Sequence, residues 1–185
     1  MKVGIIGIGS TTLDFGTRAA KAGYEVLINS PRGQAPCNEM VKNMGKNAKL
    51  SCIENTAKAE IIILFVPWDD LQKTIELLPD MTEKIILHTN NYLFSAESSL
   101  TDETKKTATQ TIASLLPTAY VVKVFSTINT SDTSNRTDEN KRILFSTENK
   151  KVKNSVKTFL DKLEYCSTEL NDIYRYNNFN SLGLQ

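Results

Sequence analysis

Two glycines, Gly7 and Gly9, follow a short apolar run at the start of the chain, Val3 to Gly7, and precede a segment with helical spacing of apolar residues. A second apolar run, Tyr24 to Ile28, comes directly after Gly23. The order strand, tight turn, helix, strand is that of a dinucleotide-binding unit. In such a unit the first glycine forms the turn, and the second lets a pyrophosphate approach the backbone at the helix N-terminus. We therefore expect this turn to bind the phosphates of a dinucleotide.

The third position of the G-x-G-x-x-G pattern, counted from Gly7, is Thr12 instead of glycine. A glycine there normally allows the helix and the strand to pack closely, so Thr12 should move them slightly apart or turn its hydroxyl toward the phosphates. The alternative is that Thr12 only caps the helix. Gly16 lies one helical turn further on the same face, and its missing side chain offers another point of close approach.

The loop after the second strand indicates which dinucleotide is bound. That strand ends at Asn29, twenty residues after Gly9, where ribose recognition is expected. No carboxylate, which would mark NAD, is present in the loop Asn29-Ser30-Pro31-Arg32-Gly33. The Arg32 guanidinium can instead form charge-assisted, bidentate bonds to a 2′-phosphate, which predicts a preference for NADP. The alternative for Arg32 is a solvated loop side chain.

The chain has 185 residues, of which 40% are hydrophobic, and a net charge of +1. These values predict one globular domain over residues 1–170 and a C-terminal tail over residues 171–185. A charge this small gives no reason to expect a nucleic acid or an anionic membrane as a partner. No segment approaches the roughly 18 apolar residues of a membrane span, and no signal-peptide pattern precedes the first strand, so we expect a cytoplasmic protein.

Three cysteines, Cys37, Cys52 and Cys166, lie far apart and in no metal-binding or redox spacing. We expect them to be reduced residues that serve in packing, and we expect no metal site.

The run Ile61 to Val66 is continuously apolar and mostly β-branched, which is typical of a strand buried on both faces of a parallel sheet. It stops at Pro67, so Pro67 and Trp68 should lie at the carboxyl end of a central strand, where open α/β sheets bind their ligands. Asp69 or Asp70 is expected to cap the helix that follows.

Helical and strand patterns alternate along the rest of the chain. The expected helices cover Cys37 to Gly45, a short connection over Asn55 to Ala59, a segment from Thr101 or Asp102 that ends at Pro117, and Lys150 to Leu163. The expected strands cover Ala48 to Cys52, Lys84 to His88, Tyr120 to Phe125, Arg142 to Ser146 and Tyr165 to Leu170. This alternation predicts an α/β fold with a doubly wound, mostly parallel sheet, a Rossmann-like NAD(P)-binding fold.

A polar stretch from Ser126 to Lys141 contains Ile128 as its only apolar side chain. Such a length without apolar residues is uncommon in a compact domain, and two interpretations stay open. The stretch is either a mobile active-site loop or simply disordered.

With these elements placed, the chain resembles the NADPH-dependent reductases of the deazaflavin coenzyme F420 and their bacterial relatives. The resemblance covers residues 1 to about 128 and rests on five short segments in family order: MKVGIIGIGS, KAGYEVLINSPRG, FVPWDDL, HTNNYL and VVKVFSTI. It implies a Rossmann-like domain that binds NADP and transfers a hydride between the nicotinamide and a flat acceptor, such as a flavin or deazaflavin. It also implies homodimers for those members that add C-terminal helices.

The resemblance also implies roles for individual residues. The pyrophosphate would lie along Gly7, Gly9, Ser10, Thr11 and Thr12, and the 2′-phosphate would be held by Ser30 and Arg32. The nicotinamide side would be lined by Val66, Pro67 and Trp68, with Thr89 and Asn90 nearby. Thr127 and Ile128 would border the acceptor.

Four positions depart from the family pattern, and they leave two functions open. Thr12 replaces the third glycine, Pro31 separates Ser30 from Arg32, Asn91 replaces a proline and Ser126 an asparagine. The chain is accordingly interpreted as an NADP(H)-dependent oxidoreductase or, alternatively, as a non-catalytic NADP(H)-binding or redox-sensing module. Hydride transfer is carried out by the cofactors and needs no nucleophile, so the absence of a catalytic triad excludes neither function.

Three further side chains have alternative interpretations. His88, the single histidine, either bonds to an acceptor or is a satisfied structural residue. Trp68 either flanks the nicotinamide or covers the start of its helix. Lys123 either faces a ligand or is a solvated lysine at the end of a strand.

Overall fold

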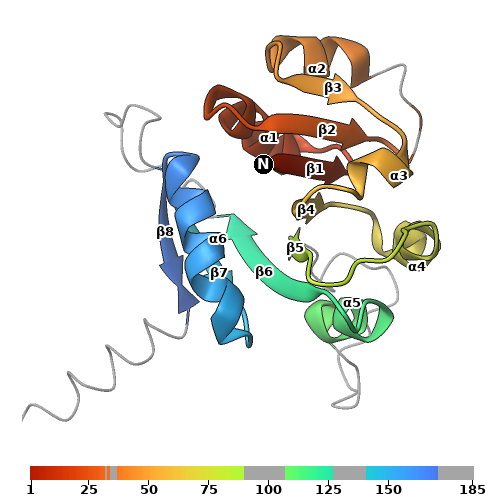
Figure 1. Cartoon of the computed structure of the whole chain (residues 1–185), viewed down its shortest axis with the longest axis vertical. Coiled ribbons are helices and arrows are strands. Elements are labelled where there is room, and N and C mark those ends of the chain that lie inside the picture. Colours follow the sequence, from red (N-terminus) through yellow and green to blue (C-terminus); the bar gives the residue numbers. More distant parts are fainter. Residues whose placement is uncertain (32, 34–36, 90–106, 127–140, 171–185) are drawn as a thin grey trace, which may run out of the picture.

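The computed structural model describes residues 1–31, 33, 37–89, 107–126 and 141–170. Within these residues eight strands form one sheet (Figure 1). The strands are β1 (Lys2–Ile6), β2 (Glu25–Asn29), β3 (Ala48–Leu50), β4 (Ile61–Leu64), β5 (Ile85–His88), β6 (Tyr120–Ser126), β7 (Lys141–Ser146) and β8 (Tyr165–Glu169). Their order across the sheet is β3-β2-β1-β4-β5-β6-β7-β8.

The strand pairings confirm the predicted doubly wound, mostly parallel sheet. The first six strands are parallel and have the order of the dinucleotide-binding folds. The strand order reverses between β1 and β4, so ligands are expected outside the carboxyl ends of these two strands. Only β7 is antiparallel to its neighbour β6 among the paired strands that the structure describes, and β8 then pairs parallel to β7.

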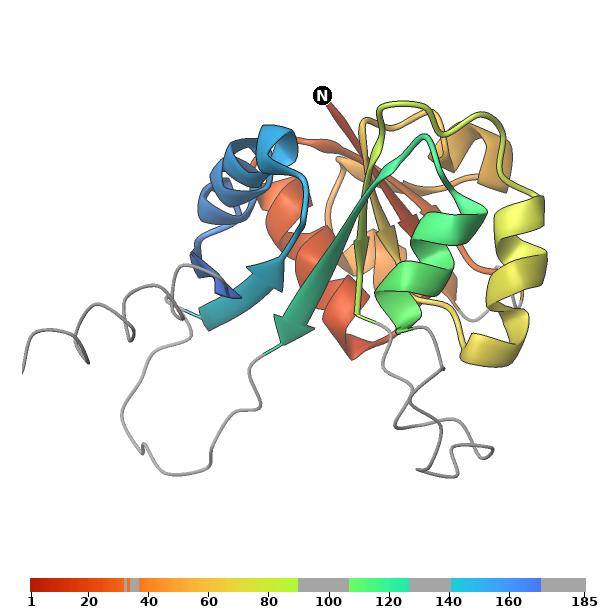
Figure 2. The same cartoon turned by 90° about the horizontal axis from the view of Figure 1, so that it is seen from below.

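Helices cover both faces of the sheet (Figure 2). They are α1 (Ser10–Lys21), α2 (Asn38–Asn43), α3 (Ile53–Thr56), α4 (Trp68–Glu76), α5 (Ala108–Leu115) and α6 (Lys150–Lys162). Residues of α1, α2 and α6 form one core with the sheet, and residues of α4, α5 and the end of α3 form the other. None of the described helices is long and apolar enough to cross a membrane.

Strand β4 shows why its sequence lacks polar alternation. Its side chains point alternately into the two cores, with Ile61 and Ile63 in the first and Ile62 and Leu64 in the second. All four are at most 4% exposed. The prediction of a strand buried on both faces is therefore confirmed, although the strand ends at Leu64 and not at Val66.

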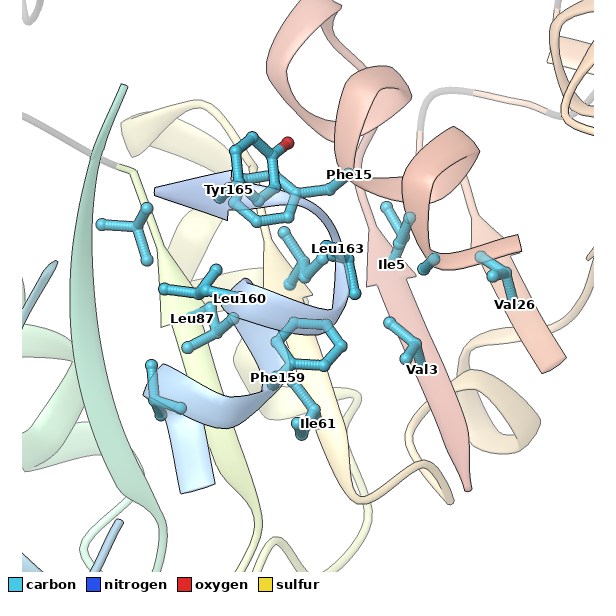
Figure 3. Packing of buried hydrophobic residues seen from close by; sticks show 14 of the residues in the cluster. Val3, Ile5, Phe15, Val26, Ile61, Leu87, Phe159, Leu160, Leu163 and Tyr165 are labelled. Carbon is cyan, nitrogen blue, oxygen red and sulfur yellow. The ribbon is translucent and has the colours of Figure 1, made fainter. Parts of the chain in front are cut away.

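The first core joins the C-terminal elements to the N-terminal ones (Figure 3). Phe159 of α6 lies near Val3 and Ile61, and the rings of Phe15 and Tyr165 are 5.1 Å apart in a tilted arrangement. Each of these large side chains stabilises the fold by about 1.5–3 kcal/mol through burial. The helix α6 and strand β8 are therefore packed as part of the same core as the first strand.

Two helices begin at residues other than those expected from the sequence. Pro67 is the N-cap of α4, so Asp69 and Asp70 lie in the first turn, where their charges favour the positive end of the helix dipole. The expected start of α5 at Thr101 or Asp102 is wrong for the described helix. Its N-cap is Thr107, whose hydroxyl accepts from the Gln110 N–H at 3.2 Å while the Gln110 side chain accepts from the Thr107 N–H at 2.8 Å.

The cysteines differ in their surroundings. Cys37 is buried, as expected for a packing residue, whereas Cys52 and Cys166 are exposed free thiols. The expectation of packing cysteines is therefore wrong for the latter two.

Candidate nucleotide-binding site

The turn between β1 and α1 packs so closely that a side chain at either fingerprint glycine would collide with Phe65. Gly7 has φ +92°, and a β-carbon there would collide with the carbonyl oxygen of Phe65, which follows β4. A β-carbon on Gly9 would collide with the Phe65 ring. The N–H of Gly7 donates to the carbonyl of Asn29 at 2.9 Å. The turn is therefore packed against the segments that follow β2 and β4, at the carboxyl edge of the sheet.

The helix α1 begins directly after this turn, with Gly9 as its N-cap. The hydroxyl of Thr12 accepts from the Gly9 N–H at 2.9 Å and donates to the Gly9 carbonyl at 3.0 Å. Thr12 is only 1% exposed. The hydroxyl therefore caps the helix, which supports that alternative, and a contact of Thr12 with the phosphates stays a prediction.

Helix and strand approach each other at Gly16 instead. A β-carbon on Gly16 would lie 3.0 Å from both the Ile5 side chain and the Met44 sulfur. Its missing side chain thus provides the close packing that the third fingerprint glycine normally allows.

The N-terminus of α1 suits a phosphate. Its first turn contains no acidic residue, so the positive end of the helix dipole is not neutralised there. Ser10 is exposed and Thr11 half-buried at this end of the helix. The glycine backbone and the helix end together fit a pyrophosphate group.

The side chain of Asn29 has a structural partner at the end of β2. Its amide donates to the carbonyl of Ser51 at 3.1 Å, which ties β2 to the end of β3. This N–H of the Asn29 amide is therefore already used in a bond within the protein. Ribose recognition by the other polar atoms of the Asn29 side chain stays a prediction. Arg32 lies outside the described residues, so its contact with a 2′-phosphate also stays a prediction.

A cavity of about 320 Å³ opens beside the turn, in the range of ligand pockets. It lies between the β1–α1 turn, the end of β2, the start of α2 and the start of α4. Its lining residues are Gly7, Ile8, Ser30, Pro31, Cys37, Met40, Phe65, Val66, Pro67 and Asp70. Four of the residues singled out in the sequence, Gly7, Ser30, Val66 and Pro67, are thus brought together.

Sequence reasoning missed six residues of this lining as ligand contacts: Ile8, Pro31, Cys37, Met40, Phe65 and Asp70. Phe65 and Asp70 lie close in sequence to the Val66-Pro67-Trp68 segment, which was predicted to contact the ligand. This closeness was the one feature of the sequence that could have identified them. Met40 is 45% exposed on the short helix α2, and an exposed apolar side chain gives no chemical signal in a sequence.

Trp68 does not line this cavity. It is the first residue of α4, partly buried, and it packs against the second core. This packing supports its interpretation as a cover over the helix start.

The carboxyl end of β5 places a second group of polar residues near the same edge. His88 is fully buried, and its Nε2 lies 3.0 Å from the hydroxyl of Thr109 on α5. Burial, with a smaller contribution from Lys123, lowers the pKa of His88 to about 4, so the imidazole is neutral at pH 7. The contact with Thr109 supports the structural interpretation of His88 at Nε2, whereas its buried Nδ1 has no hydrogen-bond partner among the described residues. Thr89 follows it, while Asn90, Thr127 and Ile128 lie outside the described residues.

Comparison with known proteins agrees with this geometry. Residues 2–92 match the family described as "NADP oxidoreductase coenzyme F420-dependent". This segment includes β1 to β5, the glycine turn and all described residues of the cavity. None of the curated proteins compared matches the sequence.

Solved structures share the fold at low sequence identity. A hypothetical protein from Sinorhizobium meliloti has a TM-score of 0.76 at 20% identity, over 92% of this chain and 84% of that one. A protein from Arthrobacter sp. FB24 described as an F420-dependent NADP reductase has a TM-score of 0.70 at 19% identity, with the same coverage. An Aspergillus terreus imine reductase, solved with NADPH4, has a TM-score of 0.66 at 17% identity, and this chain covers 62% of its length.

The family description names NADP, the cofactor predicted from the loop after β2. The resemblance inferred from five short segments is thereby confirmed for the part of the chain that holds the glycine turn. Over residues 2–92 the chain is similar to the family described as "NADP oxidoreductase coenzyme F420-dependent".

Proposed function

We propose that the protein is an NADP(H)-dependent oxidoreductase that transfers a hydride between the nicotinamide and a flat acceptor, such as a flavin or deazaflavin. One observation carries the proposal. The β1–α1 turn, whose two glycines have no room for a side chain, adjoins the 320 Å³ cavity. Both lie where the strand order reverses between β1 and β4, within the residues 2–92 that match the family. The cofactor named in the family description fits these residues.

The residues divide into three groups in this proposal. The backbone of Gly7 to Thr12, at the start of α1, holds the pyrophosphate. Asn29, Ser30 and Arg32 recognise the ribose and its 2′-phosphate. Val66, Pro67, Trp68, Thr89 and Asn90 lie toward the nicotinamide.

The chemistry belongs to the cofactor. When bound, NADPH supplies a hydride, that is two electrons and a proton, to an acceptor that takes a second proton from solvent. The residues of this chain bind the cofactor, orient it across the carboxyl edge and keep water from the apolar part of the site.

Two measurements test the proposal. Calorimetry should detect binding of NADPH, and more weakly of NADH, to the full chain. The absorbance of NADPH should then fall when a flavin, a deazaflavin or a quinone is added as acceptor. Binding of NADPH without its oxidation by any of these acceptors would favour the non-catalytic NADP(H)-binding module, and absence of any heat at millimolar NADPH would refute both.

A further inference from the structure

The ring of Phe65 lies against the second fingerprint glycine. A β-carbon built on Gly9 would have the Cδ1 and Cζ atoms of this ring at 3.0 Å, and the Cε1 atom closer still. In glycine a hydrogen takes the place of the β-carbon, so one α-hydrogen of Gly9 points at the ring. The two residues belong to different segments, since Gly9 follows β1 and Phe65 follows β4. The ring therefore covers the side of Gly9 on which a side chain would stand.

This side of Gly9 is the one that the fingerprint keeps free. In dinucleotide-binding turns the second glycine lacks a side chain so that the backbone can approach the pyrophosphate. A group at the position of its β-carbon stands between the turn and the phosphates. The Phe65 ring holds that position. The ring in this orientation and the pyrophosphate therefore compete for the same space.

Core packing does not account for the position of the ring. Leu64 and Val66, on either side of Phe65 in the sequence, are 1% and 4% exposed and belong to the second core. Phe65 is only half-buried, and among the described residues neither core includes it. Less burial is lost when such a ring moves than when a core side chain moves.

The backbone of Phe65 is held in place, so only its side chain can move. Its N–H donates to the carbonyl of Ile6 at 2.8 Å, and its carbonyl lies against Gly7. Free space adjoins the residue, because Phe65 also lines the 320 Å³ cavity. A change of side-chain rotamer can therefore take the ring away from Gly9 while the turn keeps its shape.

We propose that the Phe65 side chain controls access to the nucleotide site: in the free protein its ring blocks the approach of the pyrophosphate to Gly9, and NADP(H) binds when the ring has turned away. The inference rests on the proposed function, because it concerns how the same site takes up its cofactor. Phe65 takes no part in the hydride transfer. The apparent affinity falls in proportion to the fraction of molecules whose ring has turned away, so an open fraction of about 10% lowers it about tenfold.

Truncation of the ring tests this control. Phe65→Ala should bind NADPH about tenfold more tightly in calorimetry with the full chain, because every molecule is then open. Phe65→Val also lacks the δ, ε and ζ atoms that reach Gly9, and it keeps a β-branched apolar residue after the strand, so it should show the same gain with less risk to folding. Met40→Ala is the matched control. It shortens another apolar side chain of the same cavity, on α2, and should not tighten binding.

Binding rates separate a blocked entrance from a changed contact. If the ring acts before the nucleotide binds, its removal raises the association rate constant about tenfold and leaves the dissociation rate constant unchanged. A changed contact with the bound molecule acts mainly on dissociation. Stopped-flow fluorescence of NADPH measures both rate constants for the wild type, Phe65→Ala and Phe65→Val.

The α-hydrogen of Gly9 that points at the ring is a direct reporter of its position. An aromatic ring shifts the NMR frequency of a hydrogen held beside it. The Gly9 frequencies of the wild type and Phe65→Ala should therefore differ in the free proteins and nearly coincide when both are saturated with NADP⁺. A ring with a purely structural role would leave the same difference in the complexes.

Three outcomes would overturn the inference: unchanged or weaker NADPH binding by the folded variants, a gain that lies only in the dissociation rate, or an equal Gly9 difference in the free and bound proteins. Circular dichroism shows which variants fold, and if neither does, the Gly9 frequency of the wild type, measured with and without NADP⁺, decides. NADPH binding and acceptor reduction by the wild type without a gain in the variants defeats only the inference. A gain in the variants without reduction of any acceptor defeats only the catalytic function. Absence of NADPH binding by all of these proteins defeats both.

Discussion

The hydroxyl of Tyr165 on β8 donates to the carboxylate of Asp14 on α1 at 2.7 Å, across 151 residues of sequence. Arg18, one turn further along α1, bonds to the same carboxylate at 3.3 Å and lies 4.7 Å from the centre of the Tyr165 ring. Its guanidinium also donates to the carbonyl of Leu163 at 3.3 Å. The C-terminal helix and strand are thus fastened to the helix that follows the nucleotide-binding turn.

This contact predicts the effect of Tyr165→Phe. The variant removes one hydrogen bond to a charged acceptor and keeps the ring that packs on Phe15, so the free energy of unfolding should fall by about 1.5–3 kcal/mol. Urea denaturation followed by circular dichroism measures it. Tyr24→Phe is the matched control, because Tyr24 also packs on an aromatic ring, that of Phe159, and its hydroxyl has no described hydrogen-bond partner. A loss as large in the control would show that the bond to Asp14 contributes nothing specific.

The single histidine predicts a pH dependence of stability. Burial lowers the pKa of His88 to about 4, whereas an unfolded chain has a histidine pKa of about 6.5. Between these values the unfolded state holds more protons than the folded state, so stability falls as the pH decreases from about 6.5 to 4. The expected loss is about 3 kcal/mol.

The variant His88→Gln should flatten this slope, because it removes the only imidazole and keeps a polar side chain beside Thr109. Unfolding free energies measured at several pH values compare the two proteins. Identical slopes would mean that other groups, such as carboxylates, cause the acid sensitivity.

Two glycines with similar backbone angles should respond differently to alanine. Gly7 has φ +92° and no room for a β-carbon, whereas Gly23 has φ +85° and open space around it. Gly23→Ala should therefore cost only the conformational strain, about 1 kcal/mol. Gly7→Ala should cost at least about 3 kcal/mol, because the backbone at Phe65 must also move.

Thermal unfolding measures this difference, and calorimetry with NADPH shows its effect on binding. Gly7→Ala should abolish NADPH binding and Gly23→Ala should retain it. Equal stability of the two variants would contradict the packing of the turn against the segment after β4.

The position of Arg32 after β2 predicts a preference for NADPH over NADH. If it binds the 2′-phosphate, Arg32→Ala should weaken NADPH binding by about 1.5–3 kcal/mol and leave NADH nearly unchanged. Calorimetry with both dinucleotides measures the effect. Lys46→Ala, which removes an exposed cation near the end of α2, is the control for a general loss of positive charge. Equal losses for NADPH and NADH would show that Arg32 does not recognise the extra phosphate.

The helices and strands could be predicted from the sequence because the local order of apolar and polar residues reflects which faces are buried. The run Ile61–Leu64 has no polar residue because both of its faces are covered, and Gly7 stands where the backbone needs a positive φ. The α/β class, the position of the glycine turn and the edge of the sheet where ligands are expected followed from these patterns alone. The glycine spacing and the loop without a carboxylate then indicated an NADP site.

The contacts that give the site its shape were decided by the tertiary structure. Thr12 caps its helix, and Phe65 fills the space that Gly9 leaves, although neither role is visible in a fingerprint. His88 and Lys123 become neighbours only because β5 and β6 pair in one particular register. A local pattern fixes which side chains are buried, but the partners of a buried side chain depend on strand order and register, which join residues far apart in the chain.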